Sequence, residues 1–331
     1  MKVLFAFLLL LALPSMAQTT YETIGEIERY DSAINAILAP GAKAEVIAEG
    51  FRWSEGPLWV EQEQMLLFSD VPQNKVYKWT AEKGNEVYLQ PSGYTGKVQR
   101  GGEMGSNGLL LDGEGRLVLC QHGDRRMARM AAPLDKPAPA FVTLADAYRG
   151  KRISSPNDAV YNSDGELFFT DPPYGLPRQN DSDPAKELAW NGVYKIKKNG
   201  AVVLLLDSLT RPNGIAFFPG EKQLLIANSD PQKPTWYLYD VKGDALENGR
   251  VFYSVAGYDK TLRGLPDGLK IDKRGNVYAS GPGGIYFFRQ AGKLLGMLKL
   301  PGATSNVALS ADEKTLYITH HTKVLRLQMR H

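Results

Sequence analysis

Six segments of the chain repeat one pattern at a spacing of about fifty residues. Each segment begins with a polar residue, continues as a short alternating apolar stretch, passes through a polar turn and ends in a second apolar stretch. The segments begin at Ser54, Ser106, Pro156, Pro212, Pro266 and Ser305. Paired strands in a repeat of this length are typical of propeller blades. The sequence therefore predicts an all-β fold, a six-bladed β-propeller with roughly four strands in each blade.

The polar residue near the start of each segment occupies the same register in all six copies. These residues are Glu55, Asn107, Asn157, Asn213, Asp267 and Asn306, separated by 52, 50, 56, 54 and 39 positions. The blades of a propeller surround a central channel, which is lined by their innermost strands. Because the six residues share one register, we expect their side chains to converge at one mouth of this channel.

Residues 20–41 lie outside the repeat. Their apolar residues recur at a spacing that suits an amphipathic helix, which Pro40-Gly41 would end. We therefore predict an N-terminal helical extension, a cap at residues 18–44 that packs on the propeller. Residues 45–331 would then form the propeller catalytic domain.

The first seventeen residues have the features of a signal peptide. Lys2 is followed by an apolar run and then by small residues at Ser15 and Ala17. The run is short for a membrane span, and the small residues fit a cleavage site after Ala17. We expect a periplasmic or secreted protein that has no membrane association after cleavage.

The composition gives no indication of a nucleic-acid partner. The chain of 331 residues has 39 Lys and Arg against 36 Asp and Glu, and the two signs are interspersed. A nucleic-acid footprint would need a clustered basic face. The chain also lacks a G-x-S-x-G elbow, a phosphate-binding loop and a dinucleotide fingerprint. Serine hydrolase, nucleotidase and dehydrogenase functions are therefore disfavoured.

The six converging residues offer oxygen ligands. Glu55 and Asp267 supply carboxylates, and the other four supply side-chain amides. Ca²⁺ prefers six to eight oxygen ligands of these kinds, whereas zinc sites usually recruit His and Cys. The set therefore predicts a divalent cation, most simply Ca²⁺, on the propeller axis. Asp70, Asp171 and Tyr174 we assign instead to turns, blade contacts and packing.

Several motifs resemble those of the senescence-marker-protein/gluconolactonase family, which includes the regucalcins. They are SEGPLW, SPNDAV, RPNGIAF, LPDGLKID and SGPGGIY, and CQHGDRR at residues 120–126 is similar to the bacterial gluconolactonase branch. The resemblance spans roughly residues 45–328. It implies a six-bladed propeller that hydrolyses sugar lactones with a divalent metal, often calcium, on its axis.

The resemblance also implies roles for single residues. The family's metal ligands match Glu55, Asn157, Asn213 and Asp267, and Asp267 also matches the proposed catalytic acid/base. The candidates for substrate binding are Asn157, Asn107 and His122. One departure is Ser155, which stands where the animal enzymes have an arginine. Arg152, His122 and Arg125 are candidates to replace its contact with the sugar.

Three functions remain open at this point. The first is an exported, metal-dependent hydrolase that opens a small-molecule sugar lactone such as glucono-1,5-lactone. The second is a phosphotriesterase-like hydrolase on the same scaffold, because a fold does not fix the substrate. The third is a non-enzymatic binding propeller with a structural ion. The oligomeric state stays open in all three.

Overall fold

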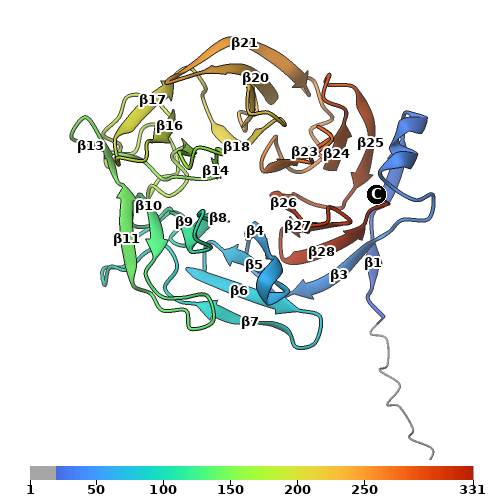
Figure 1. Cartoon of the computed structure of the whole chain (residues 1–331), viewed down its shortest axis with the longest axis horizontal. Helices are drawn as coiled ribbons and strands as arrows, with labels where there is room; N and C mark the ends of the chain where they lie inside the picture. The colour runs from blue at the N-terminus through green and yellow to red at the C-terminus, as the bar shows by residue number, and fades with distance from the viewer. Residues whose placement is uncertain (1–19, 331) are drawn as a thin grey trace, which may run out of the picture.

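The computed structural model describes residues 20–330, and its strands form six antiparallel sheets around a central axis (Figure 1). Blade 1 consists of β4 (Ser54–Val60), β5 (Met65–Asp70), β6 (Lys75–Thr80) and β7 (Gly84–Leu89). Blade 2 consists of β8 (Ser106–Leu111), β9 (Leu117–Gln121), β10 (Arg126–Met130) and β11 (Phe141–Ala145). Blade 3 consists of β14 (Ala159–Tyr161), β15 (Leu167–Asp171), β16 (Gly192–Ile196) and β17 (Val202–Leu206).

The second half of the chain continues the same meander. Blade 4 consists of β18 (Pro212–Phe217), β19 (Gln223–Asn228), β20 (Thr235–Lys242) and β21 (Ala245–Ser254). Blade 5 consists of β22 (Leu269–Ile271), β23 (Val277–Gly281), β24 (Gly284–Phe288) and β25 (Leu294–Lys299). Blade 6 takes β26 (Asn306–Leu309), β27 (Thr315–His320) and β28 (Lys323–Gln328) from the end of the chain. The all-β, six-bladed prediction is confirmed.

The ring is closed by strands from near the start of the chain. β3 (Ala44–Glu49) pairs with β28 and completes blade 6. β1 (Thr23–Ile24) adds a fifth strand to that sheet, and β2 (Glu26–Arg29) pairs with β25 of blade 5. Both ends of the described chain therefore lie beside the same two blades (Figure 1).

The predicted amphipathic helix is wrong for most of residues 20–41. Only η1 (Ser32–Ala36), a short 3-10 helix, is helical there. Gly25 lies between β1 and β2 at a φ of +78°, where a Cβ would stand 2.5 Å from the Lys299 carbonyl oxygen. The outer edges of blades 5 and 6 offer unpaired backbone groups, and pairing with them stabilises strands over a helix. The apolar residues still pack on the core, which is why their spacing was misleading.

A few short elements lie outside the regular strands of the six blades. η2 (Glu61–Glu63) forms one turn in blade 1. β12 (Ala147–Tyr148) and β13 (Lys151–Arg152) form a separate two-stranded hairpin between blades 2 and 3. Within residues 20–330, no helix has the length and apolar character needed to span a membrane. The predicted signal peptide at residues 1–17 lies outside the described residues.

The core lies between neighbouring blades. Every residue of β9, β15 and β23 is buried, because a blade is covered on both faces by the blades beside it. Trp236 of blade 4 packs against Tyr286 of blade 5, with ring centroids 5.4 Å apart. These apolar interfaces make each blade depend on the next and hold the innermost strands in fixed positions around the axis.

Glycines let the innermost strands approach one another closely. A Cβ on Gly56 would lie 2.0 Å from the Asn107 carbonyl oxygen, and one on Gly214 would lie 2.3 Å from that of Asp267. Both distances are too short for real atoms, so only glycine fits. The glycine after the axial residue is therefore required by the neighbouring blade, which explains why Asp267 precedes Gly268 at the start of a buried strand.

Buried hydroxyl groups also connect the blades at the axis. Ser69 donates to the Asn107 carbonyl oxygen at 2.9 Å, and Thr170 donates to that of Asn213 at 2.8 Å. Ser305 donates to the Ser54 carbonyl oxygen at 2.7 Å and joins the last blade to the first. These bonds satisfy backbone oxygens that would otherwise be buried without a donor.

Candidate active site

A cavity of about 300 Å³ opens at the propeller axis. We name it the axial cavity. It is lined by Trp53, Glu55, Glu103, Asn107, Asn157, Tyr174, Asn213, Ser229, Gly264, Leu265 and Asp267. Five of the six residues predicted to converge therefore do so, although they come from five different blades. Asn306 is the exception, because its side chain accepts from the Val307 N–H and its Nδ2 lies 3.4 Å from Asp158 Oδ2.

The loops that lead into the axial residues are anchored by side chains at the ends of the second strands. Asp70 accepts from the N–H groups of Arg52 and Trp53 at 3.0 and 3.2 Å. Asp171 accepts from Ser154 and Ser155 in the same way, at 2.8 and 2.6 Å. The predicted turn roles of Asp70 and Asp171 are thereby confirmed. Each carboxylate fixes the backbone two to three residues before an axial side chain.

The axial cavity concentrates buried acceptor atoms. Glu55 is only 2% exposed. Its burial, with the nearby carboxylates of Asp158 and Glu103, raises its pKa to about 8. Burial and then the charge of Glu55 raise the pKa of Asp267 well above its usual range. Carboxyl groups that share one cavity away from bulk water are costly when they are ionised together, unless a cation compensates them.

Three of the axial oxygens have no donor within the described residues. They are Oδ1 of Asn107, Asn213 and Asp267. Buried polar atoms are nearly always hydrogen-bonded, so unpaired acceptors that share a cavity indicate a ligand with positive character. Residues 20–330 contain no group of three His, Cys, Asp or Glu side chains placed to hold a metal. A cation here would therefore depend on amide as well as carboxylate oxygens.

The predicted ligand set fits a hard cation. Glu55, Asn157, Asn213 and Asp267 all line the axial cavity and bring two carboxylates and two amides. This mixture, completed by water or substrate, suits the oxygen coordination of Ca²⁺. The assignment of these four residues as ligands stays a prediction.

His122 does not lie where the sequence prediction placed it. Its ring is fully buried and does not line the axial cavity. Nδ1 lies 3.0 Å from the carboxylate of Glu103, which does line the cavity. The turn after β9 places the His122 ring against Glu103, outside the set of residues that line the axial cavity.

The residues considered as replacements for the missing arginine lie elsewhere. Arg125 and Arg152 line a second cavity that shares no residue with the axial one. Ser155 itself is buried, donates to the Pro172 carbonyl oxygen at 2.6 Å and accepts from Gly175 N–H at 2.9 Å. It shapes the turn that carries Tyr174 instead of reaching a ligand.

Sequence reasoning missed some cavity residues. Tyr174 was assigned to packing because it follows two prolines, yet it lines the cavity. Glu103 lies in a loop outside the repeated segments, so no register signal marks it. Ser229 directly follows the second strand of its repeat, β19, and its residue type gave no reason to single it out. Asp158, which does not line the cavity, directly follows an axial residue and is buried. Four of the other five repeats have glycine at its position, which was the available signal.

Comparisons with known proteins show the family to which the chain is related. The sequence model of the protein family described as the SMP-30/Gluconolactonase/LRE-like region matches residues 53–322 of this chain. A gluconolactonase from Zymomonas mobilis is 38% identical over 313 residues, covering 92% of this chain and 86% of that protein. The solved structure of a Xanthomonas campestris gluconolactonase superposes with a TM-score of 0.81 at 30% identity, covering 96% of this chain and 99% of the other.

A more distant structure shares the fold alone. It is a calcium-binding protein, regucalcin, from Agrobacterium tumefaciens, with a TM-score of 0.66 and 15% identity. It covers 85% of this chain and 92% of its own.

Proposed function

Because this chain belongs to the SMP-30/gluconolactonase/LRE-like family, a family of lactone-hydrolysing propellers, we propose that it opens a sugar lactone such as glucono-1,5-lactone. We further propose that the reaction needs a divalent cation, Ca²⁺, held by Glu55, Asn157, Asn213 and Asp267. The product would be the corresponding aldonic acid.

One observation carries the proposal. The buried carboxylate of Glu55, the half-buried carboxylate of Asp267 and two amides line one cavity from different blades, and Oδ1 of Asn213 and of Asp267 has no donor among residues 20–330. A propeller that only needed to close its axis could fill it with paired or apolar groups. Unpaired acceptors are costly in a fold, and a bound cation offsets that cost.

The cavity residues have distinct tasks in this reaction. When bound, the cation would polarise the lactone carbonyl and stabilise the charge that develops on its oxygen. Asp267 would orient the attacking water and accept its proton. Glu103, held by His122, offers acceptor oxygens to the sugar hydroxyls. Asn107 and Tyr174 would position the ring from neighbouring walls of the cavity.

The test is a pH-indicator assay on glucono-1,5-lactone, with and without a chelator and corrected for spontaneous hydrolysis. Chelator-sensitive acid release that returns with added Ca²⁺ is the expected result. Activity on phosphotriesters alone would overturn the proposed substrate. If no substrate turns over while chelator lowers the melting temperature, the ion is structural and the protein is not this hydrolase.

We also propose that the protein acts in the periplasm or outside the cell. The support is the charged start, apolar run and small residues of positions 1–17. Expression of the full chain in a bacterium, followed by mass spectrometry of the exported protein, should give a mature N-terminus at Gln18. Retention of Met1 in a cytoplasmic fraction would contradict export.

A further inference from the structure

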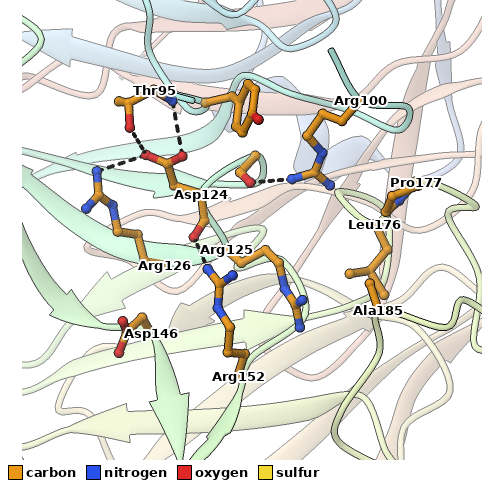
Figure 2. A pocket seen from close by; sticks show the side chains of 12 residues that line it. Thr95, Arg100, Asp124, Arg125, Arg126, Asp146, Arg152, Leu176, Pro177 and Ala185 are labelled. Atoms are coloured by element: carbon orange, nitrogen blue, oxygen red, sulfur yellow. Dashed lines mark hydrogen bonds and ion pairs between the residues drawn. The ribbon is translucent and has the colours of Figure 1, made fainter. Parts of the chain in front are cut away.

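A second cavity, of about 480 Å³, lies between blades 2 and 3. We name it the arginine cavity. Its charged lining residues are Arg100, Arg125, Arg126, Arg152, Asp124 and Asp146. Four arginines against two aspartates give it a formal excess of two positive charges. Figure 2 shows the arginine side chains gathered around this space, which has the volume of an ordinary small-ligand site.

Only one of the four arginines is fully committed to partners. Arg126 pairs with the Asp124 carboxylate at 3.0 Å, donates to Gln121 at 2.6 Å and donates to Thr143 at 3.0 Å. The Asp124 carboxylate also accepts from the N–H and hydroxyl of Thr95. Its charge is therefore used within the wall of the cavity.

The other three arginines face neutral backbone oxygens. Arg152 donates to the Asp124 carbonyl oxygen at 2.7 Å, and Arg125 Nε donates to that of Ile153 at 2.9 Å. Arg100 donates to the carbonyl oxygens of Gly123 and Gly175. Within residues 20–330, none of these three guanidinium groups forms an ion pair with a carboxylate. Their positive charge is thus left for a ligand.

Arg125 gives the strongest indication. Arg125 is only 7% exposed, and its Nη2 has no acceptor among the described residues. A buried donor without a partner is unfavourable for folding, and more so when it is charged. Burial first, and then the neighbouring charge of Arg152, lower the pKa of Arg125. The fold therefore keeps a costly, unpaired cation at this cavity.

We propose that the arginine cavity is a second ligand site, which binds a small oxyanion that carries hydroxyl groups, such as a sugar acid. The guanidinium groups of Arg125 and Arg152 recognise the oxyanion, since arginine matches the geometry of carboxylate and phosphate oxygens. The exposed carboxylate of Asp146 offers acceptors to the hydroxyls. The same donors would accept a free phosphate, so the experiment separates the two sources.

The site is distinct from the axial cavity but is connected to it. Arg100 holds the carbonyl oxygens of Gly123 and Gly175, which directly follow His122 and Tyr174 in the chain. The two cavities have no lining residue in common. Binding here therefore does not depend on the proposed lactonase reaction, and each idea can fail without the other.

Isothermal titration at low ionic strength tests the proposal on the full-length protein. The probes are gluconate, inorganic phosphate and the neutral polyol sorbitol, each titrated in the presence of chelator to remove any cation from the axial cavity. Arg152→Gln is the test variant, because its side chain is exposed and the fold should tolerate it. Lys151→Gln is the matched control, since it removes the same charge from the neighbouring position of β13 without altering the cavity lining.

We expect gluconate to bind and sorbitol not to bind. Arg152→Gln should weaken gluconate about tenfold or more, as the loss of a charged hydrogen bond predicts, whereas Lys151→Gln should match the wild type. Phosphate binding with the same dependence on Arg152 would assign the site to oxyanions without a need for hydroxyls. If neither anion binds, or if both variants weaken binding equally, the proposal is wrong.

Discussion

The axial cavity and the arginine cavity differ in the polar atoms that each leaves without a hydrogen-bond partner. The axial cavity is lined by the innermost strands, and its unpaired atoms are acceptors on Asn107, Asn213 and Asp267. The arginine cavity is lined by outer loops, and its unpaired atom is a donor on Arg125. The sign of the orphaned atoms therefore indicates the sign of the ligand in each place.

The comparison also shows which part of the fold sets each site. Residues at one register of a repeated strand must meet at the axis, so the axial site is a direct product of the propeller. Apart from Arg126 at the start of β10, the charged residues of the arginine cavity come from loops and from the β12–β13 hairpin, which no other blade repeats. The axial cavity follows from the propeller architecture, whereas the arginine cavity depends on segments that the repeat does not contain.

The largest effect should come from removing an axial carboxylate. Asp267→Asn or Glu55→Gln takes away a ligand of the proposed cation and should reduce turnover by about 10²–10³-fold, the loss typical of one group that stabilises developing charge. Steady-state rates on glucono-1,5-lactone, with circular dichroism to verify folding, give the measurement. Asp259→Asn removes the same charge from an exposed loop and serves as the control. Wild-type rates in either axial variant at saturating Ca²⁺ would contradict the proposed role of that carboxylate as a ligand of the cation.

A pH titration of stability should sharpen the comparison by isolating a group that belongs to neither cavity. Burial, with the nearby charges of His321 and Lys323, lowers the pKa of His320 to about 4. As the pH falls below the ordinary value of 6.5, the unfolded chain takes up the proton first. The free energy of unfolding should therefore decrease between about pH 6.5 and 4, on the order of 2–3 kcal/mol.

Urea melts across this range measure the effect of His320. The variant His320→Gln keeps a polar side chain beside Thr304, whose Oγ1 lies 3.1 Å from His320 Nδ1. Its melts should show a flatter dependence on pH. His321→Gln, at the exposed neighbour, removes one of the charges that lower the pKa of His320, so its slope should fall only slightly below that of the wild type. Equal slopes for His320→Gln and the wild type would assign the acid sensitivity to other groups.

A smaller loss of stability should follow when the axial strands are forced apart. Gly214→Ala places a Cβ 2.3 Å from the Asp267 carbonyl oxygen, and backbone at this position has little freedom to move. We expect a cost of about 1–3 kcal/mol, as for other overpacked sites. Gly113→Ala, in a turn with nothing within 4 Å of the new Cβ, is the control. Thermal melts that rank the two variants equally would contradict the close approach.

Sequence predicted the parts of the molecule that the repeat controls. Six copies in one register place Glu55 and Asp267 at the axis, because a strand period fixes the direction of each side chain. The N-terminal strands could not be predicted because β2 pairs with β25, about 270 positions away. β1 pairs with β3, which is itself held by β28 at the other end of the chain. Pairing between distant segments leaves no local signal.

The positions of the loop residues could not be predicted from the sequence for a related reason. Arg125 and Arg152 were considered as substitutes for the sugar contact that is missing at Ser155, whereas the hairpin and the β9–β10 turn carry them to a separate cavity. Similarly, nothing in the sequence around Glu103 shows that His122 supports it from behind. For residues outside the repeat, the sequence gives the chemical character of the side chain but not its position in the fold.

Ionic strength should separate the two cavities by the smallest effect. Arg152 lies at the surface, so its attraction for an anion is screened as salt is raised to a physiological level of about 0.15 M. Gluconate binding should therefore weaken several-fold, as titrations at low and physiological salt would measure. Glu55 and Asp267 are enclosed, and buried charges are screened much less. Turnover at saturating Ca²⁺ should consequently change less than twofold or so over the same range. If lactone turnover instead falls in step with gluconate binding, the two cavities act as a single electrostatic site and the distinction between them is lost.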